Sequence, residues 1–591
     1  MTLPFYGRTR ELEVLRSSTD SLLVVGPGGV GKTRLVEQVL PTQFCARAKA
    51  GWSQEPYAVV GQLLAQVLEV EDRERIQQAL GSEAALVTAI VPGWDAPPND
   101  ELVCLPDPSA AARRLSYVFG RFLQEACCQH AWVWFVDDWQ WMDPGSQALW
   151  PQVLSCRTIR VLGTSREPYH DDTNNSPIQQ LFLEPWSCAE TQAIWAQHAS
   201  EQEAPLYETT QGYPLQVVAA LSPAPPRSEA QERVLQVAAH LPGTLHVEFL
   251  RGLLPDLEED LSTVLEELCD LELLRRTGEQ SYVFVHDRLK ESVRDDSDVQ
   301  RQVGVYLLER WGEHDSWVLF AAIGLLHALP IAVDCKDALL EADIAAGDLS
   351  FQGRVYSDAA VHYQNAIALL QPNHWTDRYE ECLRIYRNAC DSLFCTGSIE
   401  EGIVLVETLL QNARCERDKV ESYGSLGRAY GLLQRHKDAV RVLLQALAIL
   451  GEQPPRLTLA SMLMEIRRLK SEMMTMEPAE LLDMPEIEDP DVLKTLEILM
   501  ETGTRALFCN RPDIVIYAVV RGVRLLLVHG QSAYAAVNLS SLTLVTTMAL
   551  GMIEFGQALG QLTLAVGEAR SDKLHGAKLL YNIAQCVYQR S

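Results

Sequence analysis

The chain has 591 residues and a formal net charge of −29 at pH 7, with a pI of about 4.9. This length exceeds what one hydrophobic core normally holds, so we expect roughly three to five domains. The hydrophobic content of 47% and the charged content of 22% are typical of a soluble folded protein. The acidic balance disfavours nucleic acid or an anionic membrane surface as the main partner, because such partners are normally bound by a basic face.

The N-terminus and the cysteines indicate an intracellular protein. Residues 1–8 lack the basic and apolar pattern of a secretory signal, and no apolar run approaches the ~18 residues of a membrane span. None of the 14 cysteines forms a Cys-x-x-Cys pair, which favours free thiols over a disulfide framework or a zinc site. We therefore expect a soluble cytoplasmic protein with no membrane contact.

Short apolar runs that alternate with helical patterns dominate the first 220 residues. A helix is predicted over 34–40, and four runs are predicted strands: 21–25, 132–136, 158–164 and 181–183. Alternating strands and helices predict a mostly parallel sheet that is covered by helices on both faces.

A proline-rich segment over 222–228 marks a linker before the next part of the chain. Three short helical patterns follow it, and residues 275–285 are a predicted β-hairpin. Helices followed by a hairpin favour a winged-helix module. DNA binding is the common role of such a module, but here acidic residues outnumber basic ones, which favours an internal regulatory role.

From residue 297 onward, strand patterns largely vanish and amphipathic helices recur in pairs. Small residues such as Ala359, Ala366 and Gly402 occur where two helices must approach closely, at a spacing of roughly forty residues. The pattern favours a degenerate tetratricopeptide-like (TPR-like) solenoid, whose concave face usually binds other proteins. An ordinary helical bundle is the alternative.

A glycine-rich loop follows the first predicted strand and has the form G-x-x-x-x-G-K-T. Its residues are Gly26, Pro27, Gly28, Gly29, Val30, Gly31, Lys32 and Thr33. Between a strand and a helix, such a loop cradles phosphate groups with inward-pointing backbone N–H groups. Lys32 is predicted to reach the β- and γ-phosphates of ATP, and Thr33 is predicted to ligate Mg²⁺.

Polar residues follow the second and third predicted strands. Asp137 is a candidate for holding Mg²⁺ through water, and Asp138 is a candidate for polarising the attacking water. Arg166 follows the strand over 158–164 and is placed to reach the γ-phosphate, because the carboxyl ends of parallel strands form the ligand crevice. An acidic turn at a strand end and a surface arginine are the structural alternatives.

Together these motifs resemble the STAND-type AAA+ ATPases, which are signal-transducing switch ATPases with a nucleotide domain similar to that of origin-recognition ATPases. The resemblance rests on residues 5–12, on the glycine-rich loop and on residues 137–146. The last segment is similar to the family pattern D-D-L-H-W-A-D-x-x-S, with Trp139 in place of the leucine and Gln140 in place of the histidine.

The resemblance implies three further contacts to the nucleotide. Residues 210–215 look like the family's G-x-P lid motif, in which Pro214 would pack on adenine while Arg8 lies on the other side of the base. Residues 283–289 look like the F-x-H-D segment of the family's winged helix. There, His286 would touch the β-phosphate of ADP and lock the resting state, with a structural histidine as the alternative.

We therefore expect an α/β P-loop NTPase of the AAA+/STAND type, followed by all-α repeats. The expected parts are a nucleotide-binding core (1–170), a helical lid (171–221), a winged-helix-like module (229–296) and TPR-like repeats (297–591). The expected activity is slow Mg²⁺-dependent ATP hydrolysis with Lys32, Asp138 and Arg166 as catalytic candidates.

We also expect that ATP and ADP switch the protein between two states and that the ATP state forms a homo-oligomer. Other proteins bind to the helical repeats, and nucleic acid is not expected as a partner. Two alternatives stay open, namely a scaffold that binds nucleotide without hydrolysis and a DNA-associated regulator of the origin-recognition type.

Overall fold

A computed structural model gives the architecture of most of the chain. It describes residues 5–49, 55–88, 90, 91, 94, 108–169, 178–198, 206–214, 216, 217, 227–257, 260–285, 290, 293, 296–452, 459–474, 480 and 483–569. The chain consists of two compact units, residues 1–370 and residues 371–591. Among the described residues, none of the helices has both the length and the apolar character needed to cross a lipid bilayer.

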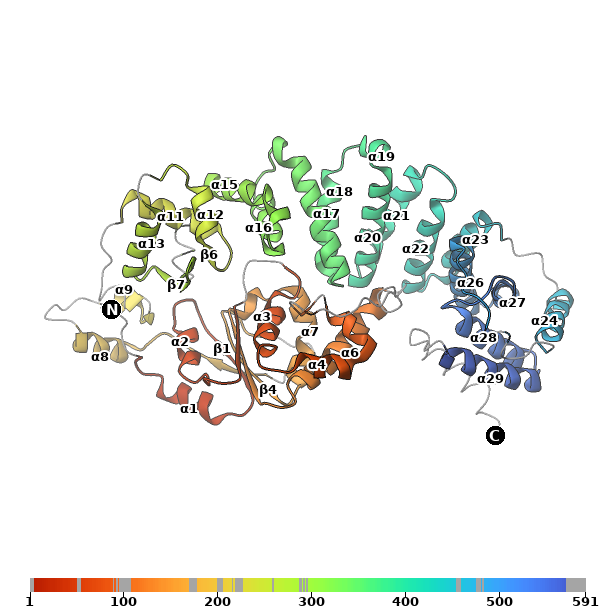
Figure 1. Cartoon of the computed structure of the whole chain (residues 1–591), viewed down its shortest axis with the longest axis horizontal. Coiled ribbons are helices and arrows are strands. Elements are labelled where there is room, and N and C mark those ends of the chain that lie inside the picture. The colour runs from red at the N-terminus through yellow and green to blue at the C-terminus, as the bar shows by residue number, and fades with distance from the viewer. Residues whose placement is uncertain are drawn as a thin grey trace. The chain divides into compact units, whose positions relative to one another are not determined.

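A parallel sheet of five strands, in the order β2-β3-β4-β1-β5, forms the centre of the N-terminal part (Figure 1). Its strands are β1 (Ser21–Val25), β2 (Cys45–Lys49), β3 (Trp132–Asp137), β4 (Ile159–Ser165) and β5 (Ile178–Phe182). All four predicted strands are present, and the predicted parallel sheet is confirmed. Strand β2 was not predicted, because the edge strand alternates small buried residues with Arg47 and Lys49 and lacks an apolar run.

Helices cover both faces of this sheet, as predicted. Leu22 and Val24 of β1 pack in one apolar cluster with residues of α1 (Thr9–Ser17) and α2 (Lys32–Glu37). Leu23 and Val25 point to the other face and pack in a second cluster. The elements of that face are α3 (Ala58–Val67), α4 (Arg73–Leu80), η1 (Gly81–Val87), α6 (Pro108–Ala126) and α7 (Pro144–Ser155).

The next part combines helices with a small antiparallel sheet in the order β6-β8-β7. After α8 (Cys188–His198) and α9 (Leu206–Thr210), its elements are α11 (Glu229–His240), β6 (Leu245–His246), α12 (Val247–Leu253), α13 (Leu261–Asp270), β7 (Leu274–Gly278) and β8 (Ser281–Phe284). The three expected helices and the expected hairpin are therefore present. The two-residue strand β6 was too short to be predicted.

The apolar core of this part continues into the first helices of the all-α region. It includes residues of α15 (Ser297–Leu308), α16 (Ser316–His327) and α17 (Lys336–Gln352), with the short turns η3 (Trp311–Glu313) and η4 (Val333–Cys335) between them. One apolar core therefore contains residues from both sides of the predicted domain boundary between residues 296 and 297. The last helix of this unit, α18 (Tyr356–Leu369), pairs with α17.

The second unit is built from helices in its described residues, and successive helices stand side by side (Figure 1). Close approach depends on small residues, as expected, because a Cβ at Gly427 would lie 2.5 Å from the Leu443 side chain. The elements are α19 (His374–Asp377), α20 (Tyr379–Thr396), α21 (Ile399–Asn412), α22 (Lys419–Leu432), α23 (His436–Ile449), α24 (Leu459–Met473), α26 (Pro490–Phe508), α27 (Pro512–His529), α28 (Ala535–Leu544), η5 (Val545–Ala549) and α29 (Ile553–Ala569).

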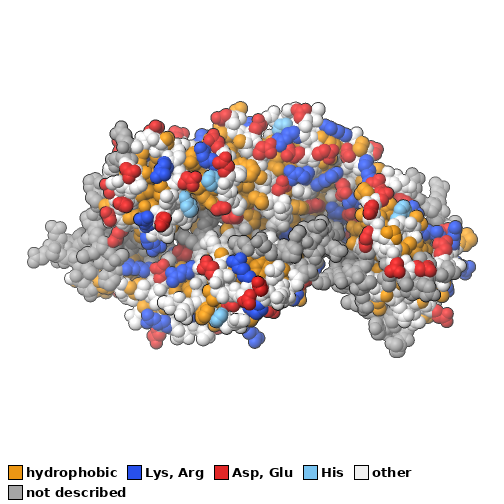
Figure 2. Space-filling model, in the orientation of Figure 1, with side chains coloured by type: hydrophobic (Ala, Val, Ile, Leu, Met, Phe, Trp, Pro, Cys, Tyr) orange, Lys and Arg blue, Asp and Glu red, His pale blue; other side chains and the backbone are white. Residues whose placement is uncertain are grey.

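Acidic and basic side chains are interspersed over the face of the molecule that Figure 2 shows. Mixed charges of this kind favour solubility and do not form the continuous basic stripe that tracks a phosphate backbone.

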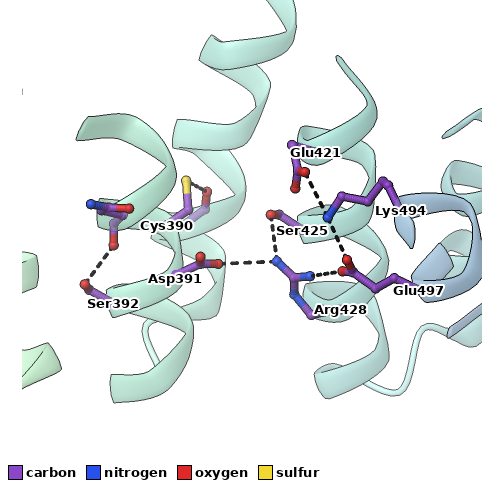
Figure 3. Close-up of polar contacts among 10 residues, drawn as sticks. Cys390, Asp391, Ser392, Glu421, Ser425, Arg428, Lys494 and Glu497 are labelled. Atoms are coloured by element: carbon purple, nitrogen blue, oxygen red, sulfur yellow. Dashed lines mark hydrogen bonds and ion pairs between the residues drawn. The ribbon is translucent and has the colours of Figure 1, made fainter. Parts of the chain in front are cut away.

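Ion pairs join three helices inside the second unit, as Figure 3 shows. Arg428 of α22 lies between Asp391 of α20 and Glu497 of α26, with N–O distances of 3.5 Å and 3.3 Å. Lys494 bridges Glu497 and Glu421 at 2.7 Å and 2.9 Å. Burial raises the pKa of the Asp391 carboxyl, and the nearby Arg428 guanidinium acts in the opposite direction.

We expect Arg428→Ala to lower the free energy of unfolding by about 1–3 kcal/mol at pH 7, because it removes the cation that pairs with the half-buried Asp391 carboxylate. Removing Arg428 should raise the pKa of Asp391 further. A carboxyl with a raised pKa loses stability as pH rises through that pKa, so the deficit should shrink at acidic pH. Arg435→Ala, which removes an exposed pair with Asp438, is the control and should cost less than about 0.5 kcal/mol. Calorimetric unfolding at several pH values checks both, and equal shifts for the two variants would contradict the expectation.

Candidate functional site

Glycines give the loop between β1 and α2 its tight turn. A Cβ at Gly26 would lie 2.4 Å from the carbonyl oxygen of Leu183, so only glycine fits where β1 ends. Gly29 and Gly31 have φ angles of 80° and 93°, in the left-handed region that favours glycine. Val30 is buried between them and anchors the loop in the apolar cluster of α1 and α2. The loop therefore has the backbone shape that the sequence motif predicts.

The Lys32 ammonium lies inside the curve of this loop. Its Nζ donates to the carbonyl oxygens of Gly26 and Pro27 at 2.7 Å and 3.1 Å. Burial lowers the pKa of Lys32, and the charge of Asp138 partly opposes that effect. The next residue, Thr33, donates to Asp137 at 2.8 Å, so Lys32 lies near the acidic end of β3.

One carboxylate oxygen of Asp137 accepts two hydroxyl hydrogen bonds. Thr33 Oγ1 donates to Asp137 Oδ1 at 2.8 Å, and Thr164 Oγ1 donates to the same oxygen at 2.5 Å. Thr33 and Asp137, the two predicted Mg²⁺ ligands, are therefore in direct contact. Both offer oxygen atoms, which are the donors that Mg²⁺ prefers, so the residues present fit this ion.

Thr164 is a site residue to which the sequence analysis gave no role. It is fully buried at the end of β4, and its Oγ1 also accepts a hydrogen bond from the backbone N–H of Asp138 at 3.0 Å. The available signal was a hydroxyl at the carboxyl end of a strand. Recognising its role requires the knowledge that β4 lies between β1 and β3.

Asp138 has a φ of 57°, which is uncommon for a residue other than glycine. Gln140 Nε2 donates to Asp138 Oδ1 at 3.3 Å, and Gln140 Oε1 accepts from the backbone N–H of Arg166 at 2.9 Å. Gln140 thus links the acidic turn after β3 to the end of β4. This residue occupies the position of the histidine in the pattern D-D-L-H-W-A-D-x-x-S.

Arg166 lies beside the glycine-rich loop. A Cβ at Gly28 would be 3.8 Å from the Cζ atom of the Arg166 guanidinium. Burial is the main cause of the lowered pKa of Lys32, and the positive charge of Arg166 lowers this pKa further. The end of β4 therefore brings this predicted catalytic candidate to the same place as Lys32 and Asp138.

Arg8 and the turn containing Pro214 are both held to the segment that follows β5. Arg8 Nη2 donates to the carbonyl oxygen of Glu184. Gly212, two residues before the half-buried Pro214, accepts from the Trp186 backbone N–H at 2.8 Å and has a φ of 73°. A Cβ at Gly212 would lie 1.9 Å from the Trp186 carbonyl oxygen, so glycine is required there.

His286 lies outside the described residues, and its contact to the β-phosphate of ADP stays a prediction. The other predicted site residues group around the carboxyl ends of β1, β3, β4 and β5, where an open α/β sheet normally binds its ligand. Such a grouping is able to surround a phosphate chain with backbone N–H groups, two cations and two carboxylates.

Residues 4–162 match the family model of the AAA ATPase domain, which contains the glycine-rich loop and β3. The predicted AAA-type ATPase domain is therefore confirmed.

A solved structure that is similar to the chain is a Signal Transduction ATPase with Numerous Domains (STAND) protein with a tetratricopeptide repeat sensor, from Pyrococcus horikoshii. The two are 15% identical, with a TM-score of 0.43, and the alignment covers 99% of this chain and 80% of that one. No curated protein matches the chain.

Lys32→Ala should weaken ATP binding by about 100-fold, because it removes the charged donor inside the loop. Isothermal titration calorimetry with Mg²⁺-ATP measures the loss. Lys437→Ala, at an exposed lysine of the second unit, is the matched control and should bind as the wild type does. Tight binding by Lys32→Ala would show that nucleotide does not bind at this loop.

Thr164→Val keeps the shape of the side chain and removes both of its hydrogen bonds in the site. We expect Mg²⁺-ATP affinity to fall by about 5- to 30-fold, because Asp137 and the Asp138 N–H lose a buried partner. Thr164→Ser restores the hydroxyl and should recover most of the affinity. Titrations with Mg²⁺ and with EDTA separate a metal-dependent loss from general loosening, and an equal loss under both conditions would argue against a link between Thr164 and the metal ligands.

Proposed function

We propose that this chain is a signalling switch that binds ATP and ADP and hydrolyses ATP slowly in the presence of Mg²⁺. The observation that carries the proposal is the shared Asp137 oxygen, which joins Thr33 of the glycine-rich loop to Thr164 of β4 beside Lys32. Lys32, Thr33 and Asp137 lie within residues 4–162, which match the AAA ATPase domain, and such domains hold Mg²⁺-nucleotide with a glycine-rich loop and an acidic residue at a strand end.

Each residue has a role in this proposal. The backbone from Gly26 to Thr33 holds the phosphates, and Lys32 contacts the β- and γ-phosphates. Thr33 and, through water, Asp137 would hold Mg²⁺, which offsets phosphate charge when it is bound. The positive charges of Lys32 and Arg166 stabilise the charge that develops on the transferred phosphoryl group. Both side chains lie at the glycine-rich loop, since Lys32 Nζ donates to Gly26 and Pro27 and a Cβ at Gly28 would lie 3.8 Å from Arg166 Cζ, which supports these roles.

Asp138 polarises the water that attacks the γ-phosphate, which yields ADP and phosphate. Gln140 donates to Asp138 and thereby uses one acceptor position of the carboxylate. A carboxylate has several acceptor positions, so this hydrogen bond is compatible with positioning of the attacking water by Asp138. The alternative is a scaffold that binds nucleotide and does not hydrolyse it.

The remaining parts of the chain regulate this core. The order of helices and strands from α11 to β8 is that of a winged helix, which supports a winged-helix-like module over 229–296 behind the lid over 171–221. In the ADP state, Pro214 and Arg8 hold the base, and His286 contacts the β-phosphate. Partner proteins bind the TPR-like repeats over 297–591 and favour exchange of ADP for ATP, because a ligand shifts an equilibrium toward the state that it binds better.

A role on DNA is disfavoured for the same module. The chain carries 79 acidic and 50 basic residues, and the visible surface mixes both signs (Figure 2). Neutralising a phosphate backbone requires a concentration of basic side chains, so an origin-recognition type of function would need a partner chain to supply the DNA contacts.

Molar mass by light scattering tests the switch. The wild type is expected to have a lower mass in ADP than in a non-hydrolysable ATP analogue, because the ATP state oligomerises. In ATP itself, the wild type should return to the ADP mass as ATP is consumed. Asp138→Asn should keep the ATP mass, because it binds nucleotide without hydrolysis. The same mass in all nucleotides, with no phosphate release, would favour a static scaffold.

A further inference from the structure

The chain that leaves β3 reaches a buried carboxylate six residues after Asp137. Asp143 caps the N-terminus of α7, where its Oδ1 accepts from the Ser146 backbone N–H at 2.8 Å. The same carboxylate accepts from the backbone N–H groups of Tyr57 and Val59 at 2.8 Å and 3.1 Å. Asp143 therefore joins the start of α3 to the start of α7, which follows the acidic turn of the nucleotide site along the chain.

Tyr57 in turn contacts the helical region. Its phenol group is buried and donates a hydrogen bond to the carbonyl oxygen of Gly353, in the turn between α17 and α18. Val355 of the same turn belongs to the apolar core of the ATPase domain. A Cβ at Gly145 would lie 2.9 Å from the Val355 side chain and 3.0 Å from Tyr57, so glycine at this position permits the close approach.

A second polar contact lies next to the first. Ser316, the first residue of α16, donates to the carboxylate of Glu55. Burial raises the pKa of the Glu55 carboxyl, and the Ser316 hydrogen bond opposes this effect. The short segment before α3 therefore contacts α16 and the turn between α17 and α18, all within the first compact unit.

The path from the nucleotide site to Tyr57 is short and packed. After Asp138, the turn η2 (Trp139–Trp141) leads to Asp143. The Trp139 ring packs edge-on against Trp150 of α7, with ring centroids 4.8 Å apart. Tyr57 itself has a φ of 62°, which is an uncommon value for a bulky residue. The hydrogen bonds of Tyr57 to Asp143 and to Gly353 stabilise this conformation.

We propose that Tyr57 is a positioning residue that couples the nucleotide site to the helical region through Asp143. A rearrangement of the acidic turn would then weaken or strengthen the contact between Tyr57 and Gly353. A movement of the α17–α18 turn would in return change the affinity for nucleotide, since the coupling free energy between two sites acts in both directions. The inference rests on the proposed switch function and specifies where the helical region acts on the core.

Tyr57→Phe removes the hydroxyl and keeps the ring. We expect a fluorescent ADP analogue to dissociate about three- to tenfold faster from the full-length variant than from the wild type, because one buried hydrogen bond no longer favours the resting state. Tyr363→Phe is the matched control. It removes another tyrosine hydroxyl hydrogen bond, to Asp348 at 2.7 Å, which joins α18 to α17. Its ADP dissociation should match the wild type.

Val355→Ala provides an independent variant, because it weakens the packing of the same turn on the core without changing Tyr57. It should also speed ADP release. If the wild type binds no ADP analogue, the proposed switch function itself is wrong. If the wild type binds ADP but both Tyr57→Phe and Val355→Ala release it at the wild-type rate, only the coupling is wrong. Equal acceleration by Tyr57→Phe and Tyr363→Phe would also overturn it, because that result indicates general loosening.

Discussion

A single carboxylate oxygen, Oδ1 of Asp137, holds the candidate nucleotide site together. It accepts hydrogen bonds from Thr33, the last residue of the glycine-rich loop, and from Thr164, at the end of β4. The strand order makes this contact geometrically available, because β4 lies between β1 and β3 in the parallel sheet. Lys32 and Arg166 then lie beside the same edge, so the positions of all charged groups of the site depend on how these three strands end.

The sequence predicted the parts of this arrangement that are local. Strands β1, β3 and β4 are buried apolar runs, and the glycine-rich loop carries its own backbone requirements at Gly26, Gly29 and Gly31. Strand β2 was not predicted, because an edge strand with alternating polar residues has no apolar run. The role of Thr164 was not predicted either, because it depends on which strands are neighbours, and strand order is not visible in a local pattern.

The long-range polar contacts were the least predictable features. Asp143 stands before Pro144 and Ser146, which is a visible helix-capping pattern, but its bonds to Tyr57 and Val59 join segments that are about 85 residues apart. In the second unit, the small residues that allow helices to pack were recognisable. The ion pairs of Arg428 with two other helices were not, since surface-like charged residues carry no signal for a specific partner.

The two hydrogen bonds on Asp137 also suggest how nucleotide would be sensed in the proposed switch. A threonine hydroxyl that ligates Mg²⁺ uses its oxygen lone pair toward the metal, and a carboxylate that binds a metal-bound water accepts a new proton donor. When Mg²⁺-nucleotide binds, Asp137 would therefore gain a contact to metal-bound water beside the hydrogen bonds that it accepts from Thr33 and Thr164. Asp137 is the residue from which the chain runs through η2 to Asp143, and Asp143 holds the backbone of Tyr57. In the proposed switch, a change of ligand at the phosphate loop would thus act on the same segment that contacts the helical region through Tyr57.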